Sequence, residues 1–427
     1  MKVAIFEDDL TFNFFPITLT RPSFFLKLGV LRFYDRVKIE SKTEPILFTR
    51  DFIGNYLKSK YNFRVNDTSS VDDETLFING LVLVKKESYK ILSNLEPNTA
   101  LSKNGRLVAV KFKSSAAKQA AELLINAPDL SKEKQILSLA EKNLEPKDVQ
   151  LIENYWEIIE ENTHQIAEDF PKLPKKGGSK LSNKVTVVGK KTQVFVGKNS
   201  EIGPNVVLDA SSGPIYIGNN TKVHPFTWIQ GPAYIGSETI IHPGSVIREG
   251  SNIGDVCRIG GEVEESIVQG FSNKPHAGFL GHAYVGEWVN LGALFTNSDL
   301  KNTYGSVKVV IRGKKVDSGT TKLGGMVGDH AKASIGSLLY TGKKVGVASQ
   351  IHGVVEEDVP SFLYYAKTLG NPLWEIMLEA AIETAKRVMA RRKVDFTEAD
   401  KTLLTKVFEL TQPERDALNP RKGPFSF

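Results

Sequence analysis

Aliphatic residues recur at every sixth position through much of the second half of this chain. Six residues match neither the 3.6-residue period of an α-helix nor the two-residue period of a free strand. The period fits a coil of short strands joined by turns, in which each hexapeptide points one aliphatic side chain into a narrow interior. The positions that keep it are Val196, Ile202, Leu208, Ile217, Val223, Ile229, Ile235, Ile241, Ile247, Ile253, Ile259, Val327, Ala333, Leu339, Val345 and Ile351. The spacing therefore predicts a parallel β-helix, because a β-sandwich with accidental spacing would not hold one register for so long.

The six-residue phase is mostly lost between Gly260 and Gly325, where only Val285 and Leu291 keep it. The segment is rich in polar and aromatic residues. A solenoid accommodates insertions as loops on one face, which is often the binding face. We therefore expect the chemistry of the protein in this segment.

A chain of 427 residues exceeds what one compact core usually organises. Most of its glycines fall in the periodic region, and the segment just before that region, PKLPKKGGSKLSNK, is typical of a linker. We predict an α/β domain over residues 1–170, a linker over 171–184, a β-helix over 185–367 and a helical tail over 368–427.

The first 170 residues alternate between buried strands and helices, which favours a sheet with covering helices. The predicted strands are Val3 to Phe6, Pro45 to Phe48 and Leu76 to Val84, and the predicted helices are Ser115 to Ala127 and Ile152 to Phe170. In the tail, Asn371 and Pro372 are predicted to open one amphipathic helix. Thr397 is predicted to cap a second helix through Leu410. We expect both tail helices to serve packing or assembly.

Composition narrows the classes of protein. A net charge of +6 is too small to indicate nucleic-acid binding and suits anionic small substrates equally well. The single cysteine, Cys257, allows no internal disulfide, redox pair or thiolate cage, and we expect it to be a small buried residue in a reducing compartment. Glu7, Asp8 and Asp9 stand where a secretory signal would be apolar, and no window is apolar enough for a membrane span. We expect a cytoplasmic protein.

His276 is the strongest candidate for catalysis among the seven histidines. It lies in the segment NKPHAGFLGHAYVGEWVNLGA, among glycines and asparagines, which predicts an imidazole on the rim of the coil. Imidazole is the usual general base at neutral pH. The alternative is a structural or merely exposed histidine.

The residues from His276 to Ala293 read H-x-x-F-L-G-H-x-x-V-G-x-x-V-N-L-G-A. This motif, together with the hexapeptides, resembles a divergent branch of the bifunctional N-acetylglucosamine-1-phosphate uridylyltransferase/glucosamine-1-phosphate acetyltransferase family. The family motif is H-x-x-Y-L-G-D-x-x-I-G-x-x-V-N-I-G-A, and the match needs no gap. The resemblance implies a left-handed β-helix, a homotrimer, and acetyl-CoA bound between neighbouring coils.

The resemblance also implies roles for individual residues. His276 matches the general base that deprotonates the attacking amine, and the backbone N–H of Ala293 matches a donor to the oxyanion. Asn290 matches a sugar contact, and Arg248 resembles the arginine that holds the sugar phosphate. Simple corner packing is the alternative for Asn290 and Ala293.

Two positions depart from the family motif. Phe279 replaces a tyrosine that offers a hydroxyl to the substrate, and His282 replaces an aspartate. Substrate identity is therefore open. The pair His276 and His282 also allows a zinc site of the kind that such trimers can hold at an interface, but no third ligand is evident and we predict no metal-binding residue.

The segment FFPITLTRPSFFLKLG resembles the P-L-T-x-x-x-P-K stretch of sugar nucleotidyltransferases, which implies phosphate contacts by Arg21 and Lys27 and a need for Mg²⁺ if this domain is active. Two family features are missing. The glycine-rich loop is replaced by EDDLTFN, and Leu81 stands where the family places its metal-binding aspartate. The acidic cluster after the first strand could hold a metal instead, although an exposed acidic turn is commoner. A degenerate domain, with Arg21 and Lys27 as surface cations, is the alternative.

The expected function is acetyl transfer from acetyl-CoA to an amino-sugar 1-phosphate, with nucleotidyl transfer by the first domain giving a UDP-sugar. The alternative is a sugar-1-phosphate nucleotidyltransferase that uses the β-helix only as a trimerisation scaffold. A pure binding or assembly scaffold is the third class considered.

Overall fold

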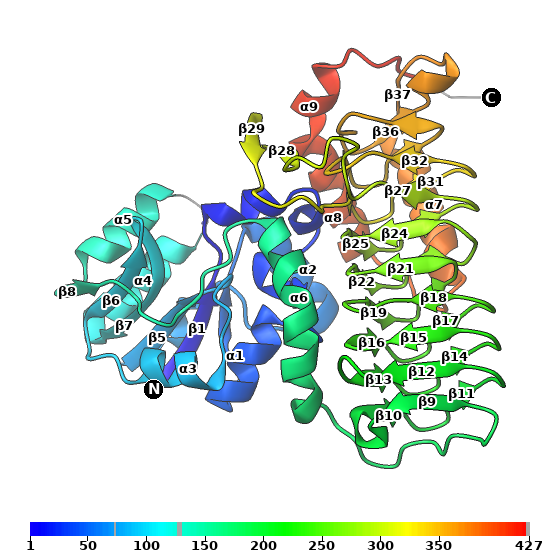
Figure 1. Ribbon diagram of the computed structural model, residues 1–427. Helices are drawn as coiled ribbons and strands as arrows, with labels where there is room; N and C mark the ends of the chain where they lie inside the picture. The colour runs from blue at the N-terminus through cyan, green and yellow to red at the C-terminus, as the bar shows by residue number, and fades with distance from the viewer. Residues whose placement is uncertain (72–73, 126–129, 424–427) are drawn as a thin grey trace. The chain divides into compact units, whose positions relative to one another are not determined.

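The computed structural model describes residues 1–71, 74–125 and 130–423. The chain forms two compact units. Unit 1 comprises Met1–Lys27, Leu31–Glu157 and Glu398–Leu403, and unit 2 comprises Leu28–Val30, Ile158–Thr397 and Leu404–Phe427. Figure 1 shows a sheet with covering helices in the blue and cyan part of the chain, and a coil of stacked short strands in the green to orange part.

Unit 1 is built on a six-stranded sheet of order β4-β1-β5-β7-β6-β8. β1 pairs in parallel with β4 and β5, whereas β7 runs antiparallel to β5 and to β6. The strands are β1 (Lys2–Phe6), β4 (Ile46–Phe48), β5 (Glu74–Asn79), β6 (Thr99–Lys103), β7 (Arg106–Lys113) and β8 (Lys142–Leu144). The three predicted strands are confirmed, but β5 ends at Asn79 rather than continuing to Val84. Gly80 leaves the strand there, and its Cα lies so close to the Phe24 ring that a side chain would not fit.

Helices cover this sheet and follow the strands along the chain (Figure 1). They are α1 (Phe33–Ser41), α2 (Asp51–Tyr61), α3 (Lys86–Ser93), α4 (Ser114–Leu124) and α5 (Leu130–Ser138). A further helix, α6 (Tyr155–Asp169), begins at the end of unit 1 and lies mostly in unit 2. The helix predicted from Ser115 begins one residue earlier, and its predicted end at Ala127 lies outside the described residues. The helix predicted from Ile152 begins at Tyr155. Alanines and aliphatic residues of α4 pack on sheet residues such as Phe77 and Phe112 to form the core of unit 1.

Unit 2 is a parallel β-helix with three faces, so the predicted fold class is confirmed. The first face holds β10 (Val194–Val196), β13 (Ile215–Ile217), β16 (Ala233–Ile235), β19 (Asn252–Asp255), β22 (Ile267–Gly270), β25 (Tyr284–Glu287), β30 (Met326–Val327) and β33 (Lys344–Val345). The second face holds β11 (Glu201–Ile202), β14 (Lys222–Val223), β17 (Ile240–Ile241), β20 (Arg258–Ile259), β23 (Asn273–Lys274), β26 (Asn290–Leu291), β31 (Lys332–Ala333), β34 (Gln350–Ile351), β36 (Leu363–Tyr365) and β37 (Trp374–Glu375). The third face holds β9 (Thr186–Gly189), β12 (Val207–Ala210), β15 (Trp228–Gln230), β18 (Val246–Ile247), β21 (Glu262–Glu264) and β24 (Phe279–Gly281), followed by β27 (Thr296–Asn297), β32 (Leu338–Leu339) and β35 (Val354–Val355).

The residues of the six-residue period form the interior of this coil, as predicted. Ile235, for example, pairs with Ile217 on one side and with Ile253 on the other. Cys257 is buried in the same core, in agreement with its predicted role. Stacking identical aliphatic positions keeps a dry, continuous core through the solenoid, in which each turn contacts only its neighbours.

The loss of phase after Gly260 arises because the turns become shorter, not because the coil stops. Ile253 pairs with Val268, fifteen residues later, where the preceding turn advances eighteen, from Ile235 to Ile253. The coil continues through β27, and the long insertion lies between β27 and β30. It contains the hairpin β28 (Lys308–Ile311) and β29 (Lys314–Asp317).

The tail differs in one respect from the prediction. Trp374 and Glu375 form strand β37, which runs antiparallel to β36, so Pro372 does not open a helix. The first tail helix begins later, and the predicted helix after Thr397 is confirmed. The tail helices are α7 (Leu378–Ala390), α8 (Glu398–Leu410) and α9 (Gln412–Asp416). None of the helices in the described part of the chain is both long and apolar enough to cross a membrane.

Candidate active sites

His276 lies at an exposed corner of unit 2, between β23 and β24. The corner is held from inside by Lys274, which is only 2% exposed and takes the register position that Ile259 holds one turn earlier. Its Nζ donates to the carbonyl oxygens of Gly260 at 2.8 Å, His276 at 3.2 Å and Gly278 at 2.8 Å. Burial lowers the pKa of Lys274 to about 8. Because buried carbonyls need donors, Lys274 fixes the path of the loop that carries His276.

Two further histidines share the face that leads to His276. His224 and His242 follow the inward residues of β14 and β17, and their rings stack with centroids 6.1 Å apart. Burial lowers the pKa of His242, and the nearby charges of His224 and His276 lower it further. This pair of stacked histidines was not predicted from the sequence. The sequence does indicate it, because each histidine directly follows an aliphatic residue of the six-residue period, Val223 or Ile241.

Ala293 and Asn290 lie on the next turn of the coil. The Leu294 N–H donates to the Ala277 carbonyl at 3.0 Å and so joins the Ala293 corner to the His276 corner. The Ala293 carbonyl accepts from the Gly336 N–H at 2.7 Å, while its own N–H donates to no group in the described parts of the chain. Asn290 is exposed, and its Oδ1 accepts from Asn273 at 3.4 Å. The predicted base and the predicted oxyanion donor are therefore on adjoining corners.

Arg248 and Phe279 belong to the third face rather than to these corners. The Arg248 Nη1 donates to Glu264 Oε2 at 3.2 Å, and Glu262 and Glu249 lie 3.6 Å and 3.9 Å from the same guanidinium. The Phe279 ring packs against the backbone of Gly281. Arg248 is thus paired with carboxylates, and a phosphate would have to displace Glu264 from it.

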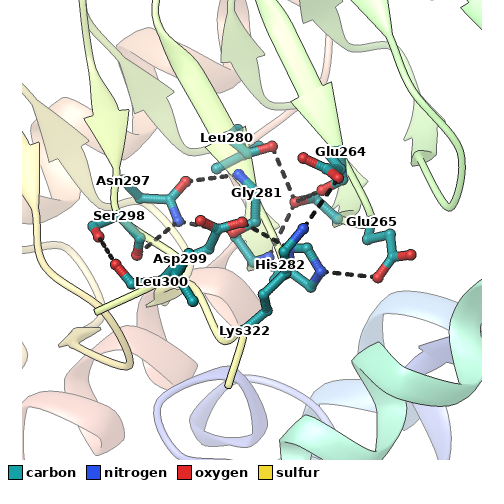
Figure 2. Close-up of polar contacts among 12 residues, drawn as sticks. Glu264, Glu265, Leu280, Gly281, His282, Asn297, Ser298, Asp299, Leu300 and Lys322 are labelled. Carbon is teal, nitrogen blue, oxygen red and sulfur yellow. Dashed lines mark hydrogen bonds and ion pairs between the residues drawn. The ribbon is translucent and has the colours of Figure 1, made fainter. Parts of the chain in front are cut away.

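His282 is the centre of a charged cluster that the sequence did not predict (Figure 2). Its Nδ1 lies 2.8 Å from Asp299 Oδ2, and its Nε2 lies 2.9 Å from Glu265 Oε2. Burial alone would lower the pKa of His282, but these two carboxylates raise it to about 9. Both ring nitrogens of His282 thus face carboxylates.

The side-chain amide of the buried Asn297 holds the backbone next to His282. The Gly281 N–H donates to Asn297 Oδ1 at 2.9 Å, and Asn297 Nδ2 donates to the Gly281 carbonyl at 2.8 Å. Figure 2 shows the imidazole directed between Glu265 and Asp299, with Lys322 beside them. Lys322 lies 3.6 Å from Glu264, which connects this cluster with Arg248.

In unit 1, Arg21 and Lys27 are 8% and 9% exposed, so they are not the surface cations of the alternative interpretation. Their loop is organised by Glu7 and Arg50, a pair that sequence reasoning missed. Arg50 Nη2 lies 3.1 Å from Glu7 Oε1 and donates to the carbonyls of Thr18 and Arg21 at 2.6 Å and 2.9 Å. Burial would raise the pKa of Glu7, but the Arg50 charge outweighs it and lowers that pKa.

Asp8 and Asp9 are also buried, so the expectation of an exposed acidic turn is wrong. One carboxylate oxygen each from Asp8, Asp9 and Glu133 of α5 lie within 4.8 Å of one another. Arg106 Nη1 donates a hydrogen bond to Asp9 Oδ1, and Asn79 Nδ2 donates one to Asp8 Oδ2 at 2.8 Å. Burial and the neighbouring carboxylates raise the pKa of Asp8 and of Glu133. Oxygen-rich, anionic surroundings of this kind suit Mg²⁺, so the residues present fit the metal that nucleotidyl transfer would need.

Comparison with known proteins gives matches in both units. The family described as "Sugar nucleotidyl transferase" matches residues 3–177, and that described as "Bacterial transferase hexapeptide (six repeats)" matches residues 214–249. A bifunctional sugar-1-phosphate nucleotidylyltransferase/acetyltransferase from Sulfurisphaera tokodaii is 36% identical over 34% of this chain and 38% of that protein. The bifunctional protein GlmU from Methanococcus aeolicus is 30% identical over 49% of this chain and 45% of that protein. The uncharacterized acetyltransferase YaiX from Escherichia coli is 30% identical over 39% of this chain and 74% of that protein. The chain thus spans less than half the length of the first two relatives.

Proposed function

The chain belongs to the hexapeptide-repeat acetyltransferase family, in a divergent branch with a sugar nucleotidyl transferase domain ahead of the coil, and we propose that unit 2 transfers an acetyl group from acetyl-CoA to an amino-sugar 1-phosphate. The observation that carries this proposal is that the corner with His276 and the corner with Ala293 are joined by a hydrogen bond. His276 is exposed to solvent on one turn. The Ala293 N–H, which has no acceptor among the described residues, lies on the next turn, and the Leu294–Ala277 hydrogen bond joins the two corners.

In the proposed reaction the substrate amine attacks the thioester carbonyl carbon directly. His276 accepts the amine proton, and the Ala293 N–H donates to the oxygen that gains negative charge. A C–N bond forms, the C–S bond breaks, and coenzyme A leaves as a thiol after taking up a proton. No acyl-enzyme is needed, since the buried Cys257 is not available as a nucleophile.

Asn290 and Phe279 are proposed to contact the sugar, and Arg248 its phosphate. Asn290 is exposed beside the Ala293 corner, which suits a hydroxyl contact. Phe279 offers an apolar ring in place of a hydroxyl, so the accepted sugar should need no hydrogen bond there. The phosphate would replace Glu264 as the partner of Arg248, because a phosphate dianion can accept two hydrogen bonds from one guanidinium.

A homotrimer is proposed as the assembled form, with the acetyl-CoA site between neighbouring coils. Large apolar side chains are exposed on unit 2, with Phe226 68%, Leu294 61% and Ile335 77% exposed. Phe226 and Leu294 occupy the same kind of corner as His276. We expect Ile335→Asp to convert trimers to monomers in sedimentation measurements, and a monomeric parent protein would contradict this part of the proposal.

Unit 1 is proposed to transfer a nucleotidyl group to the sugar phosphate, giving a UDP-sugar, with Arg21 and Lys27 near the phosphates. Bound Mg²⁺ would neutralise the charge of the triphosphate. The match of residues 3–177 to the nucleotidyl transferase family also favours a second candidate function, nucleotidyl transfer alone on a trimeric scaffold. We also propose a cytoplasmic location, because acetyl-CoA and nucleoside triphosphates are available there.

A thiol-release assay with acetyl-CoA and a panel of amino-sugar phosphates tests the proposal. We expect His276→Ala to lower the rate by about a hundredfold or more. The matched control is His164→Ala, in a side chain that is 62% exposed on α6, and it should keep the parent rate. If no amino sugar releases thiol but a nucleoside triphosphate and a sugar 1-phosphate yield pyrophosphate, the second candidate function holds instead.

A further inference from the structure

The acidic residues of unit 1 lie at a special place in its sheet. Asp8 and Asp9 follow β1, and Asn79 is the last residue of β5. The chain goes from β1 to β4 on one side and later places β5 on the other side of β1. In open α/β sheets such a reversal leaves a crevice at the carboxyl ends of the strands, where ligands bind. The carboxylates therefore stand where this fold offers a ligand site.

Fixed hydrogen bonds orient Asp8 at the carboxyl end of β1. Its Oδ1 accepts from the Leu10 N–H at 3.0 Å, and its Oδ2 accepts from Asn79 Nδ2 at 2.8 Å. Asn79 is itself fixed, because Nδ2 also donates to the Leu107 carbonyl at 3.1 Å and Oδ1 accepts from the Leu81 N–H at 3.0 Å. A carboxylate positioned by an anchored amide is what a metal ligand requires.

The surroundings of the buried Glu133 carboxylate give a second, independent indication of a cation site. Glu133 is 3% exposed, and its Oε2 accepts a long hydrogen bond of 3.4 Å from the Leu107 N–H. Oε1 is buried, and no group in the described residues forms a hydrogen bond with it. A buried carboxylate oxygen without a partner is costly, and here an oxygen of Glu133 lies within 4.8 Å of the carboxylates of Asp8 and Asp9.

The charges in this cluster do not balance among themselves. Asp8, Asp9 and Glu133 bring three carboxylates, and Arg106 is the guanidinium bonded to Asp9. With all four groups ionised, their summed charge is −2 in a largely buried place, and a divalent cation matches that charge. The side chains of Asp9 and Arg106 are 12% and 21% exposed, so a small ion can enter from their side.

We propose that Asp8, Asp9 and Glu133 bind a hard divalent cation of the Mg²⁺ class, with Asn79 as the positioning residue for Asp8. The site differs from the one that the family resemblance implies, because Leu81 replaces that aspartate and is fully buried. The inference bears on the proposed nucleotidyl transfer but is independent of it, since cation binding can be measured without either transferase reaction.

Mn²⁺ is the probe for a test with the full-length protein after chelation and dialysis. Titration followed by electron paramagnetic resonance should show one Mn²⁺ bound per chain, displaced by excess Mg²⁺. Glu133→Gln and Asp8→Asn should each weaken Mn²⁺ binding by at least about tenfold. The matched control, Glu96→Gln, removes an exposed carboxylate of the same unit and should bind as the parent does.

Thermal unfolding in chelator separates ligand loss from misfolding. Glu133→Gln removes a buried charge and keeps the side-chain shape, so its metal-free Tm should equal or exceed that of the parent. Added Mn²⁺ should then raise the Tm of the parent and not that of the variant. The proposal is overturned if the parent binds no Mn²⁺ at millimolar concentrations, or if both variants bind it with unchanged affinity. Absence of nucleotidyl transfer, with Mn²⁺ binding intact, would count against the proposed activity of unit 1 only.

Discussion

Lys274 Nζ donates a hydrogen bond to the carbonyl oxygen of His276 at 3.2 Å, from a register position that aliphatic side chains fill in neighbouring turns. A core lysine thus sets the shape of the exposed corner that carries the proposed base. Its two other acceptors, the carbonyls of Gly260 and Gly278, belong to the same corner region.

Lys274→Met should therefore destabilise the corner and slow acetyl transfer. Three carbonyls lose the hydrogen bond from Lys274, although that of Gly278 keeps the Glu262 N–H as a donor, and the loss should lower the free energy of unfolding by roughly 1–3 kcal/mol. We expect kcat to fall more than KM rises, because the base is misplaced. The matched control is Lys332→Met, since Lys332 Nζ likewise donates to the carbonyls of Trp288 and His330 but at another corner. Equal kinetic losses in both variants would contradict a positioning role for Lys274.

The stability of unit 2 should depend on the charge of His282. The folded-state pKa is about 9, above the ordinary value of 6.5, because Asp299 and Glu265 face the two ring nitrogens. The resulting stabilisation, on the order of 2 kcal/mol, is fully present below pH 6.5 and is lost as pH rises through 9. Urea unfolding of the parent and of His282→Gln from pH 6 to pH 10 measures it. The two curves should converge at high pH, and a constant gap would exclude the ion pairs as its source.

Arg248→Gln should raise the KM for the sugar phosphate by about tenfold or more, because a charge-assisted contact to the phosphate is lost. Glu264→Gln should have the opposite effect and lower KM, since it removes the carboxylate that now pairs with Arg248 at 3.2 Å. Initial-rate measurements over a range of sugar phosphate concentrations test both. If Glu264→Gln raises KM as Arg248→Gln does, the phosphate does not bind at Arg248.

Ile253→Ala should lower the free energy of unfolding by about 2–5 kcal/mol, because it opens a cavity in the interior of the coil. Ile253 is completely buried in the stack between β16 and β22. Val188→Ala is the surface control, at a side chain that is 41% exposed, and should change stability by less than about 0.5 kcal/mol. Denaturant unfolding compares the two, and similar effects would contradict an inward-facing Ile253.

The six-residue period allowed the interior of unit 2 to be predicted residue by residue, because a solenoid repeats one local environment. The same period could not reveal Lys274, which fills an interior position with a charged side chain. Its stabilising partners are carbonyl groups, and no pattern of side chains encodes them. The break in phase was visible, but its cause, a turn of fifteen residues between Ile253 and Val268, was not.

Long-range partners explain most of what the sequence did not reveal. Glu7 was grouped with Asp8 and Asp9 as one acidic cluster, but Arg50 draws Glu7 into a separate buried pair. Glu133, more than a hundred residues further along the chain, joins Asp8 and Asp9 instead. Local chemistry predicts a helix start at Pro372, whereas Trp374 pairs with the neighbouring strand β36 and forms β37. Only the folded topology decides these three outcomes.

The antiparallel direction of β37 affects whether two copies of the chain can associate end to end. A parallel coil that ended on β36 would offer a bare edge, onto which the first rung of another copy could add in register and start a fibre. The antiparallel strand occupies that edge, and Arg421 backs it through a further pairing with Trp374. On the second face, β37 thus covers the strand edge at which end-to-end polymerisation could begin.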